Sequence, residues 1–235
     1  MRQQNAGWNW RNGSVKAMNP SYDDRQFAPA TQRNREPILA VLTQILPPSG
    51  TVLEVASGTG EHAIFFAPHL QPRQWLPSDP NPLARDSIAA WRAYSPAENL
   101  HPPIALDVCE PTWPVEAPAP VADRSALAFQ IEPIQAIVSI NLIHIAPWAA
   151  CLGLMAGAQR ILPSGGILYF YGPFHRDGQP TAPSNAAFDQ SLRWQNPEWG
   201  IRDLEAVVAA AQAQGLSLVQ VIPMPANNLS VIFRA

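Results

Sequence analysis

The sequence predicts an α/β fold with a doubly wound, mostly parallel sheet. Three observations support this fold class. Short apolar runs alternate with amphipathic segments, the run at 134–141 is almost continuously apolar, and a glycine-rich turn joins the first run to a helix. Strands buried on both faces read as continuous apolar runs, and their alternation with helices is typical of parallel sheets. We therefore expect a ligand at the carboxyl ends of the strands.

The expected elements follow from apolar periodicity and from the positions of proline and glycine. Pro37 should begin or bend the first helix, Pro68 should end the second, and Pro82 and Pro147 suit the first turn of theirs. The expected order is helix 31–46, strand 51–56, helix 61–67, strand 74–78, helix 82–94, strand 103–107, strand 134–141, helix 147–162, strand 167–171, helix 201–214, strand 216–222 and strand 229–233.

The length of 235 residues suits one sizeable domain. We expect residues 27–235 to form this domain. Residues 1–26 should be a partly mobile terminal segment, with a contacting role from about Tyr22 onward. Residues 110–133 carry five prolines and are expected to form a surface insertion.

Composition argues against several classes of partner. The formal net charge is −3 and no basic run is present, so nucleic acid is not an expected partner. The start of the chain lacks a signal pattern, and no apolar stretch reaches the roughly 18 residues of a membrane helix, which predicts a soluble, cytoplasmic protein without membrane contact. Cys109 and Cys151 have no metal-binding spacing, so no metal is expected. The oligomeric state is left open.

The segment Val52–His62, VLEVASGTGEH, carries the strongest functional signal. Small residues at Ala56, Gly58 and Gly60 let the backbone turn sharply after a strand and let a ligand lie against it. A helix that begins near Glu61 would point its N-terminal N–H groups at the same place. The pattern predicts a nucleotide-type cofactor loop, and an ordinary strand-to-helix turn is the alternative.

Acids close the next two expected strands. Asp79 follows the second strand, where a carboxylate can accept hydrogen bonds from both hydroxyls of a ribose. Asp107 closes the third. The loop has no third glycine at the helix entry, which disfavours an NAD-dependent oxidoreductase.

The glycine loop and the two acids together resemble those of the class I S-adenosylmethionine-dependent methyltransferases. The resemblance implies a Rossmann-like fold with a seven-stranded, mostly parallel sheet, helices on both faces and one antiparallel strand in the last hairpin. It implies S-adenosylmethionine as the cofactor, with Glu54 near the methionine amino group, Asp79 on the ribose and Asp107 near the adenine. The expected cofactor contacts are Arg33, Glu54, Ala56, Gly58, Gly60, Asp79, Asp107 and Asn141.

A narrower resemblance extends from about residue 27 to the C-terminus. It rests on the segments 32–39, 53–63, 77–79, 196–203 and 224–228. These are similar to the little-characterised methyltransferase-like protein 26 family, a former domain of unknown function. The resemblance implies a methyltransferase fold whose acceptor is unassigned.

Asn141 and His144 directly follow the central strand, where the resemblance implies that the methyl group is transferred. His144 could take a proton from an acceptor hydroxyl, amine or thiol, or could instead shape the pocket through backbone hydrogen bonds. Asn141 is expected to orient a ligand. Arg33 could hold a carboxylate of the cofactor or of an acidic acceptor, or could be a solvated surface charge.

The segments 171–175 and 185–202 are expected to cover the acceptor, because aromatic surface beside a few charges suits a small, partly polar molecule. Trp199 could instead belong to the core and Arg202 to the surface. The expected acceptor contacts are Tyr171, His175, Asp189, Trp199 and Arg202. The predicted function is methyl transfer to a small molecule. The alternative is a protein that binds the cofactor without catalysis, as a sensor or a partner subunit.

Overall fold

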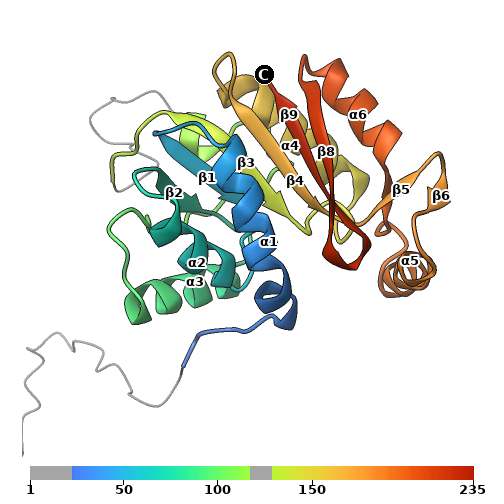
Figure 1. The fold of residues 1–235 in the computed structure, drawn as a ribbon. Coiled ribbons are helices and arrows are strands. Elements are labelled where there is room, and N and C mark those ends of the chain that lie inside the picture. The colour runs from blue at the N-terminus through green and yellow to red at the C-terminus, as the bar shows by residue number, and fades with distance from the viewer. Residues whose placement is uncertain (1–22, 117–128) are drawn as a thin grey trace, which may run out of the picture.

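The protein is described by a computed structural model over residues 23–116 and 129–235, with one large sheet between layers of helices (Figure 1). The expectations for residues 1–22, and for 117–128 within the proline-rich segment, fall outside the described residues. The helices and strands are α1 (Pro29–Ile45), β1 (Thr51–Val55), α2 (Glu61–His69), β2 (Gln74–Pro77), α3 (Pro82–Tyr94), β3 (Ile134–Ile140), α4 (Trp148–Ile161), β4 (Ile167–Gly172), β5 (Phe174–Arg176), β6 (Gln179–Pro180), α5 (Pro183–Gln195), β7 (Arg202–Asp203), α6 (Leu204–Ala213), β8 (Ser217–Met224) and β9 (Asn228–Arg234). Short 3₁₀ turns cover Pro114–Glu116 and Pro225–Asn227.

The large sheet has the strand order β2-β1-β3-β4-β9-β8. The first four strands pair in parallel, whereas β9 is antiparallel to both of its neighbours and is the antiparallel strand expected in the last hairpin. Because Gly172 pairs with Leu229, the hairpin tip at 225–227 lies at the carboxyl end of β4. A second sheet of order β6-β5-β7 continues past that end (Figure 1).

The large sheet has six strands, so the expectation of seven was wrong. The segment expected as a strand at 103–107 makes one isolated bridge, from Ile104 to Ser78 just after β2, and Leu100 before it makes another, to Trp75 of β2. Pro102 and Pro103 lie between those bridges and have no backbone N–H to continue a ladder. The segment therefore follows the edge of the sheet without becoming a strand.

Two prolines behave differently from expectation. Pro68 does not end α2, which continues to His69, and Pro37 lies inside α1, which begins at Pro29. Proline lacks only its own backbone N–H, so Pro68 removes one hydrogen bond of α2, and the helix continues past it to His69. Helix α6 begins at Leu204, later than expected, because the Asp203 side chain caps it by accepting a hydrogen bond from the backbone N–H of Glu205.

The segment between β4 and α6 contains elements that we did not expect. Helix α5 buries only Asn185 and Leu192, so its apolar periodicity is too sparse to predict a helix. Strands β5, β6 and β7 have only three, two and two residues, which is too short for an alternating pattern to be recognised. This insertion lies at the carboxyl end of β4, the edge of the sheet at which we expect a ligand.

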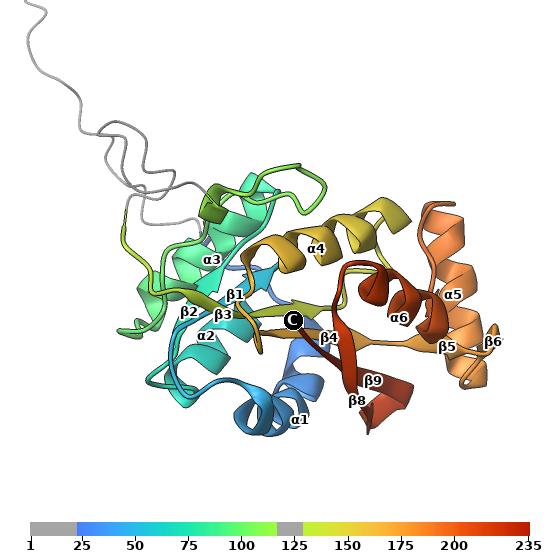
Figure 2. The ribbon, with the colours of Figure 1, turned by 90° about the horizontal axis from the view of Figure 1, so that it is seen from above.

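Side chains alternate between the two faces of the sheet. In β4, Leu168 and Phe170 join the core under α4 and α6, whereas Tyr169 and Tyr171 join the core under α1 and α2. Figure 2 shows these two helix layers on opposite sides of the sheet. Burial on both faces explains the continuous apolar runs of the sequence. The findings support an α/β, Rossmann-like architecture.

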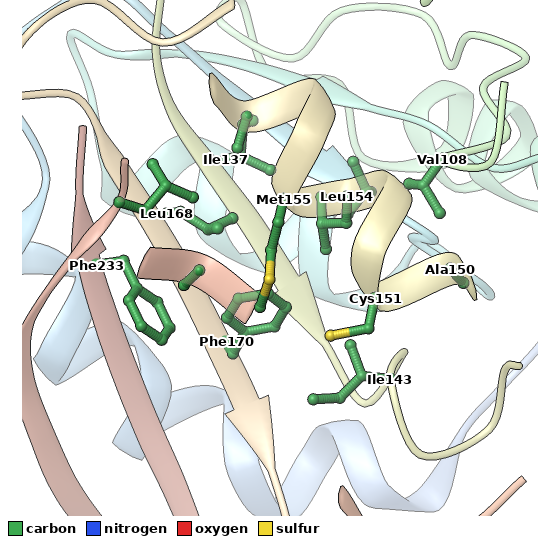
Figure 3. Packing of buried hydrophobic residues seen from close by; sticks show 14 of the residues in the cluster. Val108, Ile137, Ile143, Ala150, Cys151, Leu154, Met155, Leu168, Phe170 and Phe233 are labelled. Atoms are coloured by element: carbon green, nitrogen blue, oxygen red, sulfur yellow. The ribbon is translucent and has the colours of Figure 1, made fainter. Parts of the chain in front are cut away.

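Helix α4 packs closely on the sheet through Cys151, Leu154 and Met155 (Figure 3). Its Gly157 leaves room for the ring of Trp113, since a Cβ there would lie only 2.0 Å from that ring. Trp113 is 1% exposed, whereas residues 110–112 just before it are exposed, so this one side chain anchors the proline-rich segment in the core. The surface insertion expected over 110–133 stays a prediction. Cys151 is buried, Cys109 is exposed, and both are free thiols.

No helix within the described ranges is long and apolar enough to cross a membrane. Among the same residues, no group of three or more His, Cys, Asp or Glu side chains is placed to hold a metal ion.

Candidate active site

The glycine loop lies between β1 and α2 at the carboxyl edge of the sheet. Ala56, Gly58 and Gly60 all have positive φ, at 52°, 56° and 87°. A Cβ on Gly60 would lie 2.8 Å from the side chain of Ile88 on α3, so this glycine is required both by backbone conformation and by close packing. A Cβ on Gly58 would meet no atom within 4 Å. The loop is therefore packed at Gly60 and open at Gly58.

Asp79 holds this loop in place. Its Oδ2 accepts a hydrogen bond from the backbone N–H of Gly58 at 3.0 Å, and its Oδ1 accepts one from Asn81 at 2.9 Å. The residue is only 7% exposed, so these are charge-assisted bonds in a largely dry setting. The acid expected at the ribose is thus also the residue that fixes the loop.

Thr59 is held from two sides, by residues that the sequence did not single out. Ser87 on α3 donates to the carbonyl oxygen of Thr59 at 2.8 Å, and the Thr59 hydroxyl donates to Glu61 Oε2 at 3.2 Å. The same two side chains bind the segment 23–28: Ser87 Oγ accepts from the N–H of Gln26, and Glu61 Oε2 accepts from the N–H of Ala28. The N-terminal segment and the glycine loop therefore share their anchors.

Glu54 in β1 is 1% exposed, and its Oε2 accepts a hydrogen bond from Trp75 Nε1 at 2.8 Å. Burial raises the pKa of this carboxyl to about 7, although the hydrogen bonds from Trp75 and Ser57 oppose that rise. Glu54 thus faces the interior beneath the loop. Its expected contact with the methionine amino group stays a prediction.

Glu54 should make stability fall as the pH rises. Because its pKa is about 7 in the folded protein and 4.5 as the reference value, the native state holds a proton that the unfolded chain loses between these pH values. Relative to Glu54→Gln, the free energy of unfolding of the unmodified protein should fall by roughly 3 kcal/mol between pH 4.5 and 7. The pKa values of the buried His62 and His144, lowered to about 4, make stability rise with pH in both proteins, so the difference between the two isolates Glu54. Glu54→Gln keeps an acceptor for Trp75, and urea titrations of both proteins from pH 4.5 to 8 measure this difference in slope.

The exposed Glu98 offers a matched control. In Glu98→Gln, the free energy of unfolding should depend on pH as it does in the unmodified protein. Equal slopes for Glu54→Gln and the unmodified protein would show that Glu54 is not the titrating group.

The end of β3 brings Asn141 and His144 together with Gly172 at the end of β4. Asn141 has a φ of 59°, and its N–H donates to the carbonyl oxygen of Tyr171 at 2.8 Å. A Cβ on Gly172 would lie 3.0 Å from His144 Cε1 and 3.6 Å from Asn141 Oδ1. Gly172 therefore provides the space in which both predicted catalytic side chains meet.

His144 is 3% exposed, and Phe188 of α5 packs against its ring with centroids 5.8 Å apart. Burial, reinforced by the charge of Arg202, lowers the pKa of the imidazole to about 4, so the ring is neutral at pH 7. Its buried Nδ1 has no hydrogen-bond partner among the described residues. A neutral imidazole with an unpaired ring nitrogen is suited to exchange a hydrogen bond or a proton with a ligand.

The predicted acceptor residues lie around the α5 insertion, but two of them bind backbone. Asp189 of α5 accepts from the N–H of Ile201 and from Arg193 Nε, and Arg202 donates to three backbone carbonyls. Trp199 is half-buried. The contact of all three with an acceptor stays a prediction, and for Asp189 and Arg202 a structural role is already evident.

The other predicted acceptor residues are at the end of β4 and in β5. Tyr171 is buried, and burial raises the pKa of its hydroxyl, although a hydrogen bond with Asn34 of α1 opposes that rise. His175 is half-buried, and its Nε2 has no partner among the described residues. Asn34 Oδ1 also bonds His62 Nε2 at 2.8 Å, which links α1 and α2 at this edge.

Arg33 and Asp107 make no contact with the glycine loop among the described hydrogen bonds. Arg33 is exposed on α1. Asp107 is exposed, and its Oδ1 accepts a hydrogen bond from the N–H of Cys109 at 2.9 Å. Their contacts with the methionine carboxylate and the adenine stay predictions.

Comparison with known proteins shows which family this chain matches and which solved structures have a similar fold. A family model described as "Protein of unknown function (DUF938)" matches residues 25–235. Similar solved structures include an O-methyltransferase family protein from Burkholderia thailandensis (TM-score 0.67, 13% identity, 87% of this chain and 57% of that chain). A second is an O-methyltransferase family 2 protein from Planctomyces limnophilus in complex with apigenin (TM-score 0.65, 18% identity, 88% of this chain and 60% of that chain). A third is human N-acetylserotonin methyltransferase in complex with its cofactor (TM-score 0.67, 13% identity, 87% of this chain and 52% of that chain).

This chain spans about half to three fifths of the length of those proteins. At such low identity the likeness concerns the fold, which is that of the Rossmann-like methyltransferases.

Proposed function

Because the chain belongs to the DUF938 family of proteins of unknown function, we propose its function from the site: S-adenosylmethionine-dependent transfer of a methyl group to a small molecule. One observation carries the proposal. A glycine loop fixed by a buried acid stands at the end of β1, and the end of the neighbouring strand β3 presents a buried, neutral imidazole with an unpaired nitrogen. The fold of the structural neighbours supports it.

The loop fits such a cofactor at two points. The space over Gly58, which a Cβ would fill without meeting protein, can admit the cofactor against the backbone. Asp79 keeps lone pairs on both carboxylate oxygens beyond the two backbone bonds, and these can accept from ribose hydroxyls. Glu54, Asp107, Arg33 and Asn141 remain proposed contacts.

The cofactor supplies a methyl group on a sulfonium, a reactive donor that needs no electrophile from the protein. The chain's own task is to align donor and acceptor and to exclude water. His144 is neutral and buried, so it can accept the proton that a hydroxyl, amine or thiol loses when its heteroatom takes the methyl group. Asn141 can orient the acceptor with its amide.

A hydroxyl is the acceptor we favour. The names of two structural neighbours describe O-methyltransferases, and one of them is seen with apigenin. A neutral imidazole suits a hydroxyl, because its ring nitrogen can accept the proton that the hydroxyl loses as the oxygen takes the methyl group. Phe188 offers an aromatic surface beside His144.

A second candidate is a cofactor-binding protein without catalysis. It is favoured by the enclosure of His144, which is only 3% exposed beneath α5. An acceptor can reach this ring only if residues that cover it move, and Phe188 of α5 is one of them. Movement is feasible because α5 buries just two of its side chains.

The test begins with calorimetric titration of S-adenosylmethionine and S-adenosylhomocysteine, with NAD as the control ligand. We expect dissociation constants on the order of micromolar for the first two and no heat for NAD. Transfer of a labelled methyl group to a panel of phenols should then occur, and His144→Gln should abolish transfer while keeping cofactor affinity. Binding without transfer would support the second candidate. If neither cofactor form binds, the proposal is wrong.

Three finer inferences accompany the proposal. We infer that the protein acts in the cytoplasm on a free small molecule, without nucleic acid or membrane as partner. We infer that it is related to the methyltransferase-like protein 26 family, on the segments named above. We further infer that residues 27–235 form a single domain.

A further inference from the structure

Arg202 reaches from β7 to the turn that carries His144. Its Nε donates to the carbonyl oxygen of Ile143 at 2.9 Å, and its Nη2 donates to that of Ala146 at 2.6 Å. Nη2 also donates to the carbonyl oxygen of Glu198 at 2.8 Å. One guanidinium therefore joins the residues on either side of His144 to the segment that follows α5.

The backbone of the same segment holds His144 directly. The N–H of Gly200 donates to the carbonyl oxygen of His144 at 3.0 Å, and the N–H of Ile201 donates to Asp189 of α5. The guanidinium carbon of Arg202 also lies 5.8 Å from the centre of the Trp148 ring, at the start of α4. These contacts fix the His144 turn against α5 and α4 without touching the imidazole.

We infer that Arg202 is a positioning residue for His144: by binding the carbonyls of Ile143 and Ala146 it fixes the turn that aims the imidazole at Gly172. The inference rests on the proposed function and replaces the expected acceptor contact of Arg202. The planar guanidinium suits the task, because it donates in several fixed directions at once. A lysine keeps the charge but cannot reproduce that fork.

The test uses the full chain and readouts that need neither cofactor nor acceptor, so its failure is separate from failure of the proposed function. The pKa of His144 is followed by NMR of ring nitrogens, with its signal assigned by its loss in His144→Gln. Amide hydrogen exchange of residues 142–146 is measured in parallel. The variants are Arg202→Lys and Arg202→Met. The control is Arg160→Met, which removes a partly exposed arginine paired with Glu116.

In both Arg202 variants we expect amide exchange of 142–146 to become at least about tenfold faster, a change of about 1.4 kcal/mol. The pKa of His144 should rise from about 4 toward 6.5 as the released ring is hydrated. The lysine variant separates position from charge, because it keeps the cation. Arg160→Met should change neither readout.

Unchanged exchange and titration in both Arg202 variants would overturn the inference. Since a variant can fail to fold, the Nε–H of Arg202 in the unmodified chain gives an independent measurement. We expect slow exchange with water for this proton, held at Ile143. Exchange as fast as that of an exposed arginine would also overturn it.

Discussion

Replacing Asp79 with alanine should weaken S-adenosylmethionine binding by more than tenfold. The change removes the carboxylate proposed for the ribose, and it also leaves the N–H groups of Gly58 and Asn81 without their partner. Gly58 is partly exposed and Asn81 is exposed, so water can replace part of each lost bond, and the cost is below the roughly 1–3 kcal/mol of a fully buried donor. The loop would also no longer be fixed before binding. Asp79→Asn should be nearly as damaging, because its NH₂ group would face one of the two N–H donors.

Calorimetry measures the effect, and thermal unfolding separates loss of the site from loss of the fold. Asp86 on α3 is exposed, so Asp86→Asn is a control with the same chemistry nearby. An unchanged dissociation constant in folded Asp79→Ala would remove this acid from the cofactor site.

Gly60→Ala should destabilise the protein more than Gly165→Ala, although both glycines have nearly the same positive φ. Their φ values are 87° and 84°. An alanine at positive φ costs about 1–2 kcal/mol, and this cost should be seen at both positions. At Gly60 the new Cβ would also lie 2.8 Å from Ile88, whereas at Gly165 nothing lies within 4 Å. Overpacking of this kind adds about 1–3 kcal/mol.

Urea unfolding of the two variants gives the difference directly. Gly60→Ala should also lose cofactor affinity, because relief of the contact must move either α3 or the loop. If the two variants are equally stable, the close approach of Gly60 to α3 is not a constraint, and the loop is less tightly packed than described.

The sequence predicted the elements that are defined by local patterns. The run before the glycine loop and the near-continuous apolar run of β3 lie within one or two residues of their expected bounds, because burial on both faces leaves a direct trace in residue type. The strand expected at 103–107 failed because two prolines outweighed its apolar character. Helix α5 was missed because it buries so little that its period carries no signal.

In the candidate site, too, the features that a local pattern encodes could be predicted and those that depend on distant contacts could not. The turn at Gly58 and Gly60 and the acid Asp79 beside it could be predicted, because backbone turns and strand-end acids leave local patterns in the sequence. Their contact with a cofactor stays a prediction. The roles of Ser87 and Arg202 could not, because each depends on contacts between residues 28 or more positions apart, which no local pattern encodes. For Arg202, residue type suggested a ligand contact, whereas its hydrogen bonds go to backbone.

The shared anchors of the N-terminal segment have a thermodynamic consequence. Ser87 and Glu61 each bond both to Thr59 and to the segment 23–28, so attachment of that segment and the binding-ready shape of the loop belong to one equilibrium. By linkage, a ligand that stabilises the loop tightens the segment by the same factor, and anything that detaches the segment weakens the ligand equally. A protease site placed at residues 23–28 would therefore report occupancy of the loop, through slower cleavage when the cofactor is bound.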